Sequence, residues 1–181
     1  MKSVIVEMAS SLGPESVCIH VEGPDGSGKS TLVPILAARL GARVIGTSDP
    51  PTSRSECYDR IKERIVPGVV CDRSSGLVSE LVYGPTLRGR TLIEESELWG
   101  IISSLAHAVR FIYCRPPNGR FIVKHRDGEA KEHTDAVTEK HLQLVSRYDE
   151  VIEEIRRLGG TVIKYDWTST NVEEIALCVE F

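Results

Sequence analysis

Short runs of apolar and β-branched residues alternate along this chain with longer stretches whose apolar positions recur at helical spacing. The short runs predict strands at Val17–Val21, Arg43–Gly46, Val69–Asp72, Phe111–Cys114 and Thr161–Tyr165. The longer stretches predict helices at Ser30–Leu40, Ser53–Val66, Ser74–Tyr83, Leu92–Val109, Thr134–Leu158 and Asn171–Val179. Alternating strands and helices form βαβ crossovers, so we expect a three-layer α/β/α fold around a five-stranded parallel sheet.

The composition indicates one globular domain. Of 181 residues, 41% are hydrophobic and 27% are charged, which excludes disorder, collagen-like repeats and a coiled coil over the whole chain. No linker divides the chain, so we expect a single domain over residues 1–181. The sequence leaves open whether residues 1–14 form a peripheral segment or pack on the core.

The charge and the cysteine content limit the possible partners and the cellular compartment of the protein. The net charge of −4 argues against a protein that binds nucleic acid over its whole surface, but it allows a local basic groove. No apolar run approaches the roughly 20 residues that span a bilayer, so we expect no membrane partner. The five cysteines form no CxxC pair, which is typical of small buried thiols in a reducing compartment. We therefore expect a cytoplasmic protein.

The segment Gly23–Ser30, GPDGSGKS, follows the first predicted strand and matches the phosphate-loop pattern G-x-x-x-x-G-K-[ST]. Its backbone N–H groups and the following helix N-terminus would face a phosphate, Lys29 would reach the β- and γ-phosphates, and Ser30 would ligate Mg²⁺. A plain glycine turn before a helix is the alternative interpretation. We expect ATP and Mg²⁺ to bind at Gly23, Asp25, Gly26, Ser27, Gly28, Lys29, Ser30 and Thr31.

The phosphate-loop motif is compatible with several classes of nucleotide-binding protein. A GTPase switch would carry the guanine-reading string N-K-x-D, which is absent, and a motor ATPase would need a longer chain. A small kinase fits the length. A nucleotide-binding regulatory module without phosphoryl transfer stays as an alternative from a different class.

Asp72 and Arg73 follow the apolar run VVC of the predicted strand Val69–Asp72, at the edge of the sheet where ligands of such folds bind. A carboxylate there could accept a proton from an attacking hydroxyl or bind the Mg²⁺ shell. An adjacent arginine could hold an acceptor phosphate through two parallel hydrogen bonds. The alternative is an aspartate at a helix N-terminus beside a surface arginine.

These segments resemble known enzymes. Val21–Thr31 is similar to the phosphate loop of thymidylate kinases, and Asp72–Ser74 with Ser79–Gly84 is similar to a later segment of that family. The form Ser79–Gly89, SELVYGPTLRG, more closely resembles bacteriophage kinases related to thymidylate kinase, some of which act on 5-hydroxymethyluracil in DNA. The resemblance implies a P-loop kinase fold and, if the chain is phage-encoded, the cytoplasm of a bacterial host.

The resemblance also implies roles for single residues. Asp72 would be the base or the metal-shell acid, Arg73 would hold the acceptor phosphate, and Asp25 would face the acceptor rather than ATP. Tyr83 would lie along the acceptor pocket, and Arg88 would be a second acceptor-phosphate contact. Thymidylate kinases usually carry Tyr-Gln where this chain has Tyr83 and Gly84, which argues against free dTMP as the acceptor.

A basic stretch without acidic residues runs from residue 110 to residue 126, with Arg110, Arg115, Arg120, Lys124 and Arg126. It is either a solvated face, a lid over residues 115–135, or a track for a DNA backbone with Phe121 for stacking. In a lid, Lys124 or Arg126 would neutralise charge in the transition state. Some thymidylate kinases carry a catalytic arginine where this chain has Gly26, so a lid cation would be needed.

Two aromatic side chains rank lower as candidates. His107 is expected to be structural, and Trp167, after the last strand, either stacks on adenine or packs in the core. We therefore expect a kinase that moves the γ-phosphoryl group of Mg·ATP to a pyrimidine nucleotide, with 5-hydroxymethyluridine in DNA as the preferred acceptor. The alternative acceptor is a free deoxynucleotide or deoxynucleoside. The sequence leaves open whether the protein forms a homodimer.

Overall fold

The computed structural model of the protein describes residues 2–12, 17–46, 49–73, 76–117 and 131–179. Its elements are α1 Lys2–Ser11, β1 Cys18–Glu22, α2 Lys29–Leu40, β2 Arg43–Ile45, α3 Arg54–Arg64, β3 Val69–Asp72, α4 Val78–Tyr83, the π-helical turn η1 Gly84–Arg88, α5 Glu95–Leu105, β4 Val109–Cys114, α6 Lys131–Glu139, α7 His141–Arg157, β5 Thr161–Tyr165 and α8 Val172–Val179. All five predicted strands are present, and their order along the chain confirms the alternating pattern.

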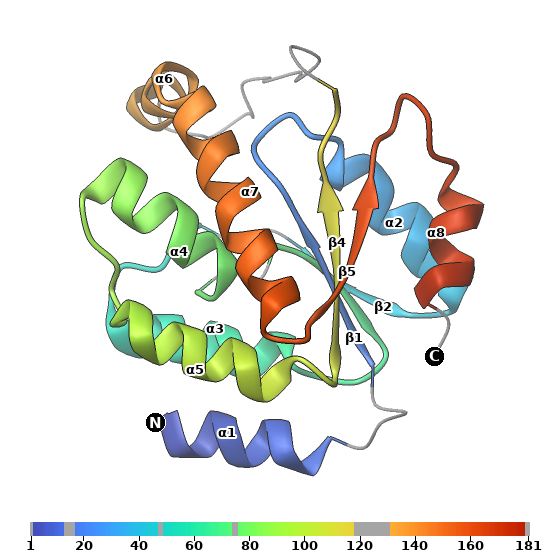
Figure 1. Ribbon diagram of the computed structural model, residues 1–181, viewed down its shortest axis with the longest axis horizontal. Helices are drawn as coiled ribbons and strands as arrows, with labels where there is room; N and C mark the ends of the chain where they lie inside the picture. Colours follow the sequence, from blue (N-terminus) through green and yellow to red (C-terminus); the bar gives the residue numbers. More distant parts are fainter. Residues whose placement is uncertain (1, 13–16, 47–48, 74–75, 118–130, 180–181) are drawn as a thin grey trace.

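The five strands form one parallel sheet in the order β2-β3-β1-β4-β5. Strand β1 lies at the centre, with Val21 beside Asp72 of β3 and Glu22 beside Tyr113 of β4. The carboxyl ends of β1, β3 and β4 therefore meet at one edge of the sheet, where the loop after β1 also lies (Figure 1). The segments that follow these strands, which the sequence predicts to bind ligands, therefore lie at the same edge of the sheet.

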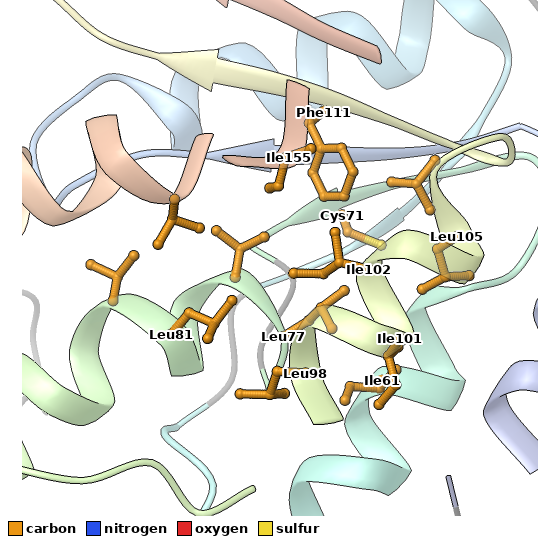
Figure 2. Packing of buried hydrophobic residues seen from close by; sticks show 14 of the residues in the cluster. Ile61, Cys71, Leu77, Leu81, Leu98, Ile101, Ile102, Leu105, Phe111 and Ile155 are labelled. Carbon is orange, nitrogen blue, oxygen red and sulfur yellow. The ribbon is translucent and has the colours of Figure 1, made fainter. Parts of the chain in front are cut away.

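Helices cover both faces of the sheet, as Figure 1 shows. On one face, α2 and α8 enclose a core that includes Ile19, Leu36 and Ile175. On the other face, α3, α4, α5 and α7 enclose a larger core (Figure 2), with labelled members Ile61, Cys71, Leu77, Leu81, Leu98, Ile101, Ile102, Leu105, Phe111 and Ile155. The three-layer α/β/α fold predicted from the sequence is confirmed.

The N-terminal segment packs on this core as a helix. In α1, Ile5 and Ala9 are fully buried in the larger core cluster. The helix lies beside α5, at the bottom of Figure 1, and it also contacts α3. The described part of residues 1–14 is therefore a packed element, although it lies outside the three layers.

The predicted helix over 134–158 is wrong as a single element, because it divides into α6 and α7 at Lys140. Lys140 Nζ donates a hydrogen bond of 2.8 Å to the carbonyl of Thr86 in η1. This bond holds the junction of α6 and α7 against another part of the chain. No glycine or proline marks this break in the sequence. The helix predicted at Leu92–Val109 is also shorter, since Val109 begins β4.

Four of the five cysteines follow the expectation of buried thiols, and Cys178 does not. Cys18, Cys57, Cys71 and Cys114 are buried free thiols, and Cys178 is an exposed free thiol. Burial raises the pKa of each of the four buried thiols to about 12. Among the helices of the described residues, none combines the length and the apolar character needed to cross a bilayer.

His20 is a buried titratable group in the middle of β1. Its side chain is 1% exposed, packs edge-on against Phe111 at 5.8 Å, and hydrogen-bonds through Nε2 to the Arg64 carbonyl at 3.0 Å. Because the carbonyl accepts, Nε2 carries the proton of the neutral ring. Burial lowers the pKa of His20 from 6.5 to about 4, and the nearby Arg64 charge adds to this effect.

We expect His20 to make stability depend on pH. Its folded pKa lies below the unfolded value of 6.5, so its contribution is complete above pH 6.5 and is lost as pH falls toward 4. Between about pH 7.5 and pH 5 the loss should be about 2 kcal/mol of unfolding free energy. Urea unfolding of wild type and His20→Gln at both pH values tests this, because glutamine can donate to Arg64 but does not titrate. An equal pH dependence in both proteins would contradict it.

Candidate active site

The predicted phosphate loop joins the end of β1 to the start of α2. Gly28 is the N-cap of α2, has a φ of 92°, and supplies no side chain to the first-turn N–H groups of the helix. Those N–H groups and the positive end of the helix dipole are therefore directed at the space above the loop. Such a turn is the arrangement that binds the phosphates of a nucleotide.

Position 23 requires glycine, because the loop backbone lies close to the backbone of Cys114. A Cβ at this position would lie 2.5 Å from the carbonyl oxygen of Cys114 and 2.8 Å from Ser27 Oγ, and its φ is 144°. Since Cys114 is the last residue of β4, the loop rests directly on the end of the neighbouring strand. Any side chain at position 23 would push the loop away from the sheet.

Lys29 is buried within the loop, with 4% of its surface exposed. Its Nζ donates hydrogen bonds to the carbonyls of Gly23 at 2.7 Å and Pro24 at 2.8 Å. Burial and the charge of Arg73 lower the pKa of Lys29 to about 8, against the opposing charges of Asp25 and Asp72. The ammonium is thus held at the centre of the loop, where a phosphate would meet it.

Asp72 ends β3 and is 5% exposed. Side chains alternate along a strand, and Val70 belongs to the α2–α8 core, so Asp72 lies on the α2 side of the sheet. Its charge acts on Lys29, which places the carboxylate beside the phosphate loop as predicted.

Ser30 and Asp72 are the residues that would hold Mg²⁺. The Ser30 hydroxyl belongs to the exposed first turn of α2, and Asp72 adds a carboxylate from the neighbouring strand. Hydroxyl, carboxylate and phosphate oxygens are the hard donors that Mg²⁺ prefers, so this donor set fits the ion. The described part of the chain has no cluster of three or more histidine, cysteine, aspartate or glutamate side chains that could hold a metal alone.

Three residues assigned to the acceptor side meet beside the loop. Arg73 Nη2 forms an ion pair with Asp25 Oδ1, and the Tyr83 hydroxyl donates to Asp25 Oδ2 at 2.8 Å. Only 14% of the Arg73 side chain and 20% of the Asp25 side chain are exposed. Although burial opposes the shift, the charges of Arg73 and Lys29 hold the pKa of Asp25 well below its usual range. We call Asp25, Arg73 and Tyr83 the Asp25 triad.

Arg73 adopts an unusual backbone conformation. Its φ of 69° is the only positive value for a non-glycine residue in the described ranges. Its N–H donates to the Val21 carbonyl at 3.0 Å, which extends the β1–β3 pairing by one residue. A non-glycine residue with a left-handed backbone costs about 1–3 kcal/mol and persists where the surrounding contacts hold it there. For Arg73 these contacts are the N–H bond to Val21 and the ion pair with Asp25.

The helical segment after Asp72 and Arg73 contains a π-helical turn. In a regular α-helix the Leu81 carbonyl would accept from residue 85, but Pro85 has no N–H group and its ring crowds that carbonyl. The backbone widens into η1, and Arg147 of α7 donates through Nε to Leu81 O at 3.2 Å. Together with the bond from Lys140 to Thr86, this contact fastens η1 and α4 to α7.

Arg88 pairs with a buried carboxylate. Its Nη2 lies 2.6 Å from both oxygens of Glu80, which is 2% exposed and also accepts the N–H of Leu92 at 2.6 Å. The structure therefore joins Arg88 to Glu80 and does not join it to the Asp25 triad. The sequence pattern assigns no role to Glu80, because a glutamate on a short helix is normally solvated.

Gly84 has little space for a side chain. A Cβ there would lie 3.1 Å from Arg90 O and 3.2 Å from Thr91 Cα. The backbone of residues 90 and 91 thus leaves little room for a side chain at position 84.

The predicted lid over 115–135 lies largely outside the described residues, and so do Lys124, Arg126 and Phe121. At its first end, Arg115 forms an ion pair with Asp149 of α7, from Nε to Oδ1 at 3.1 Å, and Asp149 also accepts from the Tyr113 hydroxyl at 2.6 Å. Arg115 is therefore bound to α7 where the chain leaves β4.

Trp167 lies against the phosphate loop. A Cβ on Gly28 would be 3.2 Å from its Cδ1, and the residue is 39% exposed. A hollow of about 330 Å³ lies nearby at the ends of β4 and β5, lined by Arg115, Pro116, Pro117, Asp149, Lys164 and Asp166. Trp167 is thus a surface residue of the loop region, and the alternative of core packing is wrong. His107, which was expected to be structural, is exposed and lies two residues beyond the end of α5.

We expect the affinity for Mg·ADP to depend on the charge of Lys29. With a pKa of about 8, the Lys29 ammonium predominates at neutral pH and is lost as pH rises through 8. The dissociation constant, measured by calorimetry, should stay constant up to about pH 7.5 and then rise by up to about tenfold per pH unit. Circular dichroism controls for unfolding, and an affinity unchanged at about pH 9.5 would contradict the assigned role.

Comparison with known proteins identifies the fold. The sequence finds no match among protein-family models and none among curated proteins. The YorR protein of Bacillus subtilis, solved in complex with phosphorylated GDP, matches with a TM-score of 0.63 at 21% identity, over 89% of this chain and 92% of that chain. Thymidylate kinase from Candida albicans matches with a TM-score of 0.53 at 13% identity, over 91% and 89%. The chain has the fold of thymidylate-kinase-like P-loop kinases.

Proposed function

We propose that the protein is a kinase that transfers the γ-phosphoryl group of Mg·ATP to a hydroxyl group. The observation that carries this proposal is the buried Lys29 ammonium within a phosphate loop, with Asp72 on the adjacent strand and the Asp25 triad alongside. A purely regulatory nucleotide-binding module needs neither a second site nor a carboxylate beside the first. The kinase fold of the two solved structures supports the same conclusion.

The chemistry would be in-line displacement. The acceptor oxygen attacks the γ-phosphorus, the bond from that phosphorus to the β–γ bridging oxygen breaks, and ADP leaves. Loop N–H groups and Lys29 would stabilise the charge that develops on the phosphate oxygens. Ser30 and Asp72 would hold Mg²⁺, which would supply positive charge against the phosphates. Asp72 is the candidate base for the hydroxyl proton or, alternatively, only a member of the metal shell.

The lid cations belong to this proposal on sequence grounds. We propose that Lys124 or Arg126 supplies transition-state charge, since Gly26 leaves the loop without the catalytic arginine that some thymidylate kinases carry there. The described residues offer Lys29 and Arg73 as the cations beside the loop, and Arg73 is paired with Asp25.

We propose 5-hydroxymethyluridine in DNA as the acceptor. The resemblance of Ser79–Gly89 to bacteriophage kinases and the acid-free stretch from Arg110 to Arg126 support a DNA substrate. Charge pairing favours it too. Arg73 is neutralised by Asp25 and Arg88 by Glu80, so the two arginines proposed for an acceptor phosphate carry little free charge for the dianion of a nucleoside monophosphate.

A free deoxynucleotide or deoxynucleoside is the second candidate. The fold similarity to a thymidylate kinase and to YorR, whose structure contains phosphorylated GDP, favours it. Asp25 distinguishes the candidates, because by resemblance it would bind a free 3′-hydroxyl, which a nucleotide inside a DNA strand lacks.

We expect radioactive phosphate from γ-labelled ATP to appear on duplex DNA that contains 5-hydroxymethyldeoxyuridine. Free dTMP and free 5-hydroxymethyldeoxyuridine serve as competing acceptors, and unmodified DNA of the same sequence is the matched control. Label on free dTMP and none on the modified DNA would reject the DNA acceptor while retaining the kinase.

Replacing Lys29 tests the transfer itself. In Lys29→Ala the ammonium bound to Gly23 and Pro24 is lost, and we expect transfer to fall by about a hundred- to a thousandfold or more. Circular dichroism and thermal unfolding should show an intact fold. Arg156→Ala is a suitable control, since Arg156 is exposed on α7 and its guanidinium pairs with Glu153 of the same helix at 3.3 Å. Near-normal turnover in Lys29→Ala would refute the mechanism.

A further inference from the structure

Both oxygens of the Asp25 carboxylate are bound from outside the phosphate loop. Oδ1 is paired with Arg73, which follows β3, and Oδ2 accepts the hydroxyl of Tyr83, the last residue of α4. Asp25 itself lies inside the loop, between Gly23 and Gly28. A loop that must receive phosphates is therefore anchored by one of its own side chains to two different elements.

The backbone next to Asp25 carries the contacts that position Lys29. The Pro24 carbonyl, which is peptide-bonded to Asp25, accepts from Lys29 Nζ at 2.8 Å and from the N–H of Ser27 at 3.3 Å. Displacement of Asp25 would move this carbonyl and thereby change where the ammonium sits. The Pro24 carbonyl thus links the anchored Asp25 to the Lys29 ammonium.

The two anchoring residues have little freedom to follow such a displacement. Arg73 is fixed by its N–H bond to Val21 and its left-handed backbone. Tyr83 is 8% exposed, packs edge-to-face against Tyr148 with ring centres 6.0 Å apart, and lies under the Arg73 guanidinium at 5.7 Å. The Asp25 triad is thus a rigid support on the loop's acceptor side.

We propose that Arg73 and Tyr83 are positioning residues for the donor nucleotide: through Asp25 they hold the phosphate loop in its binding conformation before the nucleotide arrives. This inference rests on the proposed binding of Mg·ATP. A preformed loop binds the nucleotide more tightly, because no binding free energy is lost in ordering the loop. By linkage, any acceptor that takes Arg73 or Tyr83 away from Asp25 also changes the affinity for the donor.

Calorimetric titration with Mg·ADP alone tests this without an acceptor. Tyr83→Phe removes only the hydroxyl bound to Asp25, and we expect the dissociation constant to rise about tenfold, since that hydrogen bond ends on a charged group. Tyr58→Phe is the matched control. Tyr58 is also buried and also donates to a carboxylate, that of Glu97, but it joins α3 to α5 away from the loop, so its affinity should equal that of wild type.

A double-mutant cycle separates positioning from general destabilisation. In an Asp25→Ala background, adding Tyr83→Phe should leave the Mg·ADP affinity unchanged, because the anchored carboxylate is already absent. Thermal unfolding of all variants fixes a titration temperature at which each is folded. An affinity of Tyr83→Phe within about twofold of wild type, or an equal loss in both backgrounds, would overturn the inference and leave the proposed kinase standing. Failure of the wild type to bind Mg·ADP would instead reject the proposed function together with it.

Discussion

The close packing of the phosphate loop on the ends of the central strands is the constraint on which the rest of the site depends. Gly23 touches the last carbonyl of β4, and Lys29 fills the centre of the loop with its ammonium on two loop carbonyls. Because interiors are densely packed, a loop held this tightly has few alternative conformations. The side chains at the edge of the sheet therefore keep nearly fixed positions relative to the loop.

That packing brings charged groups out of water, and the structure compensates them in pairs. Asp25 balances Arg73, and the buried Glu80 balances Arg88. Asp149 balances Arg115 in a more exposed pair. A buried pair gives little net stability, but removing one partner leaves an uncompensated charge, which costs much free energy. We therefore interpret these pairs as devices that fix the orientation of α4, η1 and α7 around the loop rather than as a main source of stability.

The sequence was sufficient for those features that follow from local pattern. β-branched runs predicted every strand of the sheet, and the phosphate-loop motif with the end of β3 located Lys29 and Asp72. The meeting of Asp25, Arg73 and Tyr83 also agrees with residues chosen by resemblance.

Features that depend on distant partners could not be found in this way. The break at Lys140 is accompanied by a bond to Thr86, 54 residues earlier, and the burial of Glu80 depends on Arg88 and Leu92. The packing of α1 rests on Ile5 and Ala9, whose burial requires α3 and α5 to be in place. In each instance a side chain ordinarily found in solvent, or a short apolar run, acquires its role only from tertiary contacts.

The position of Trp167 on Gly28 has a practical consequence. The chain contains two tryptophans, and this one covers the residue at which the phosphate loop becomes helix α2. Its indole emission would therefore report on that junction directly. With Trp99 replaced, the intrinsic fluorescence of the protein would come from Trp167 and would report occupancy of the loop without an attached dye.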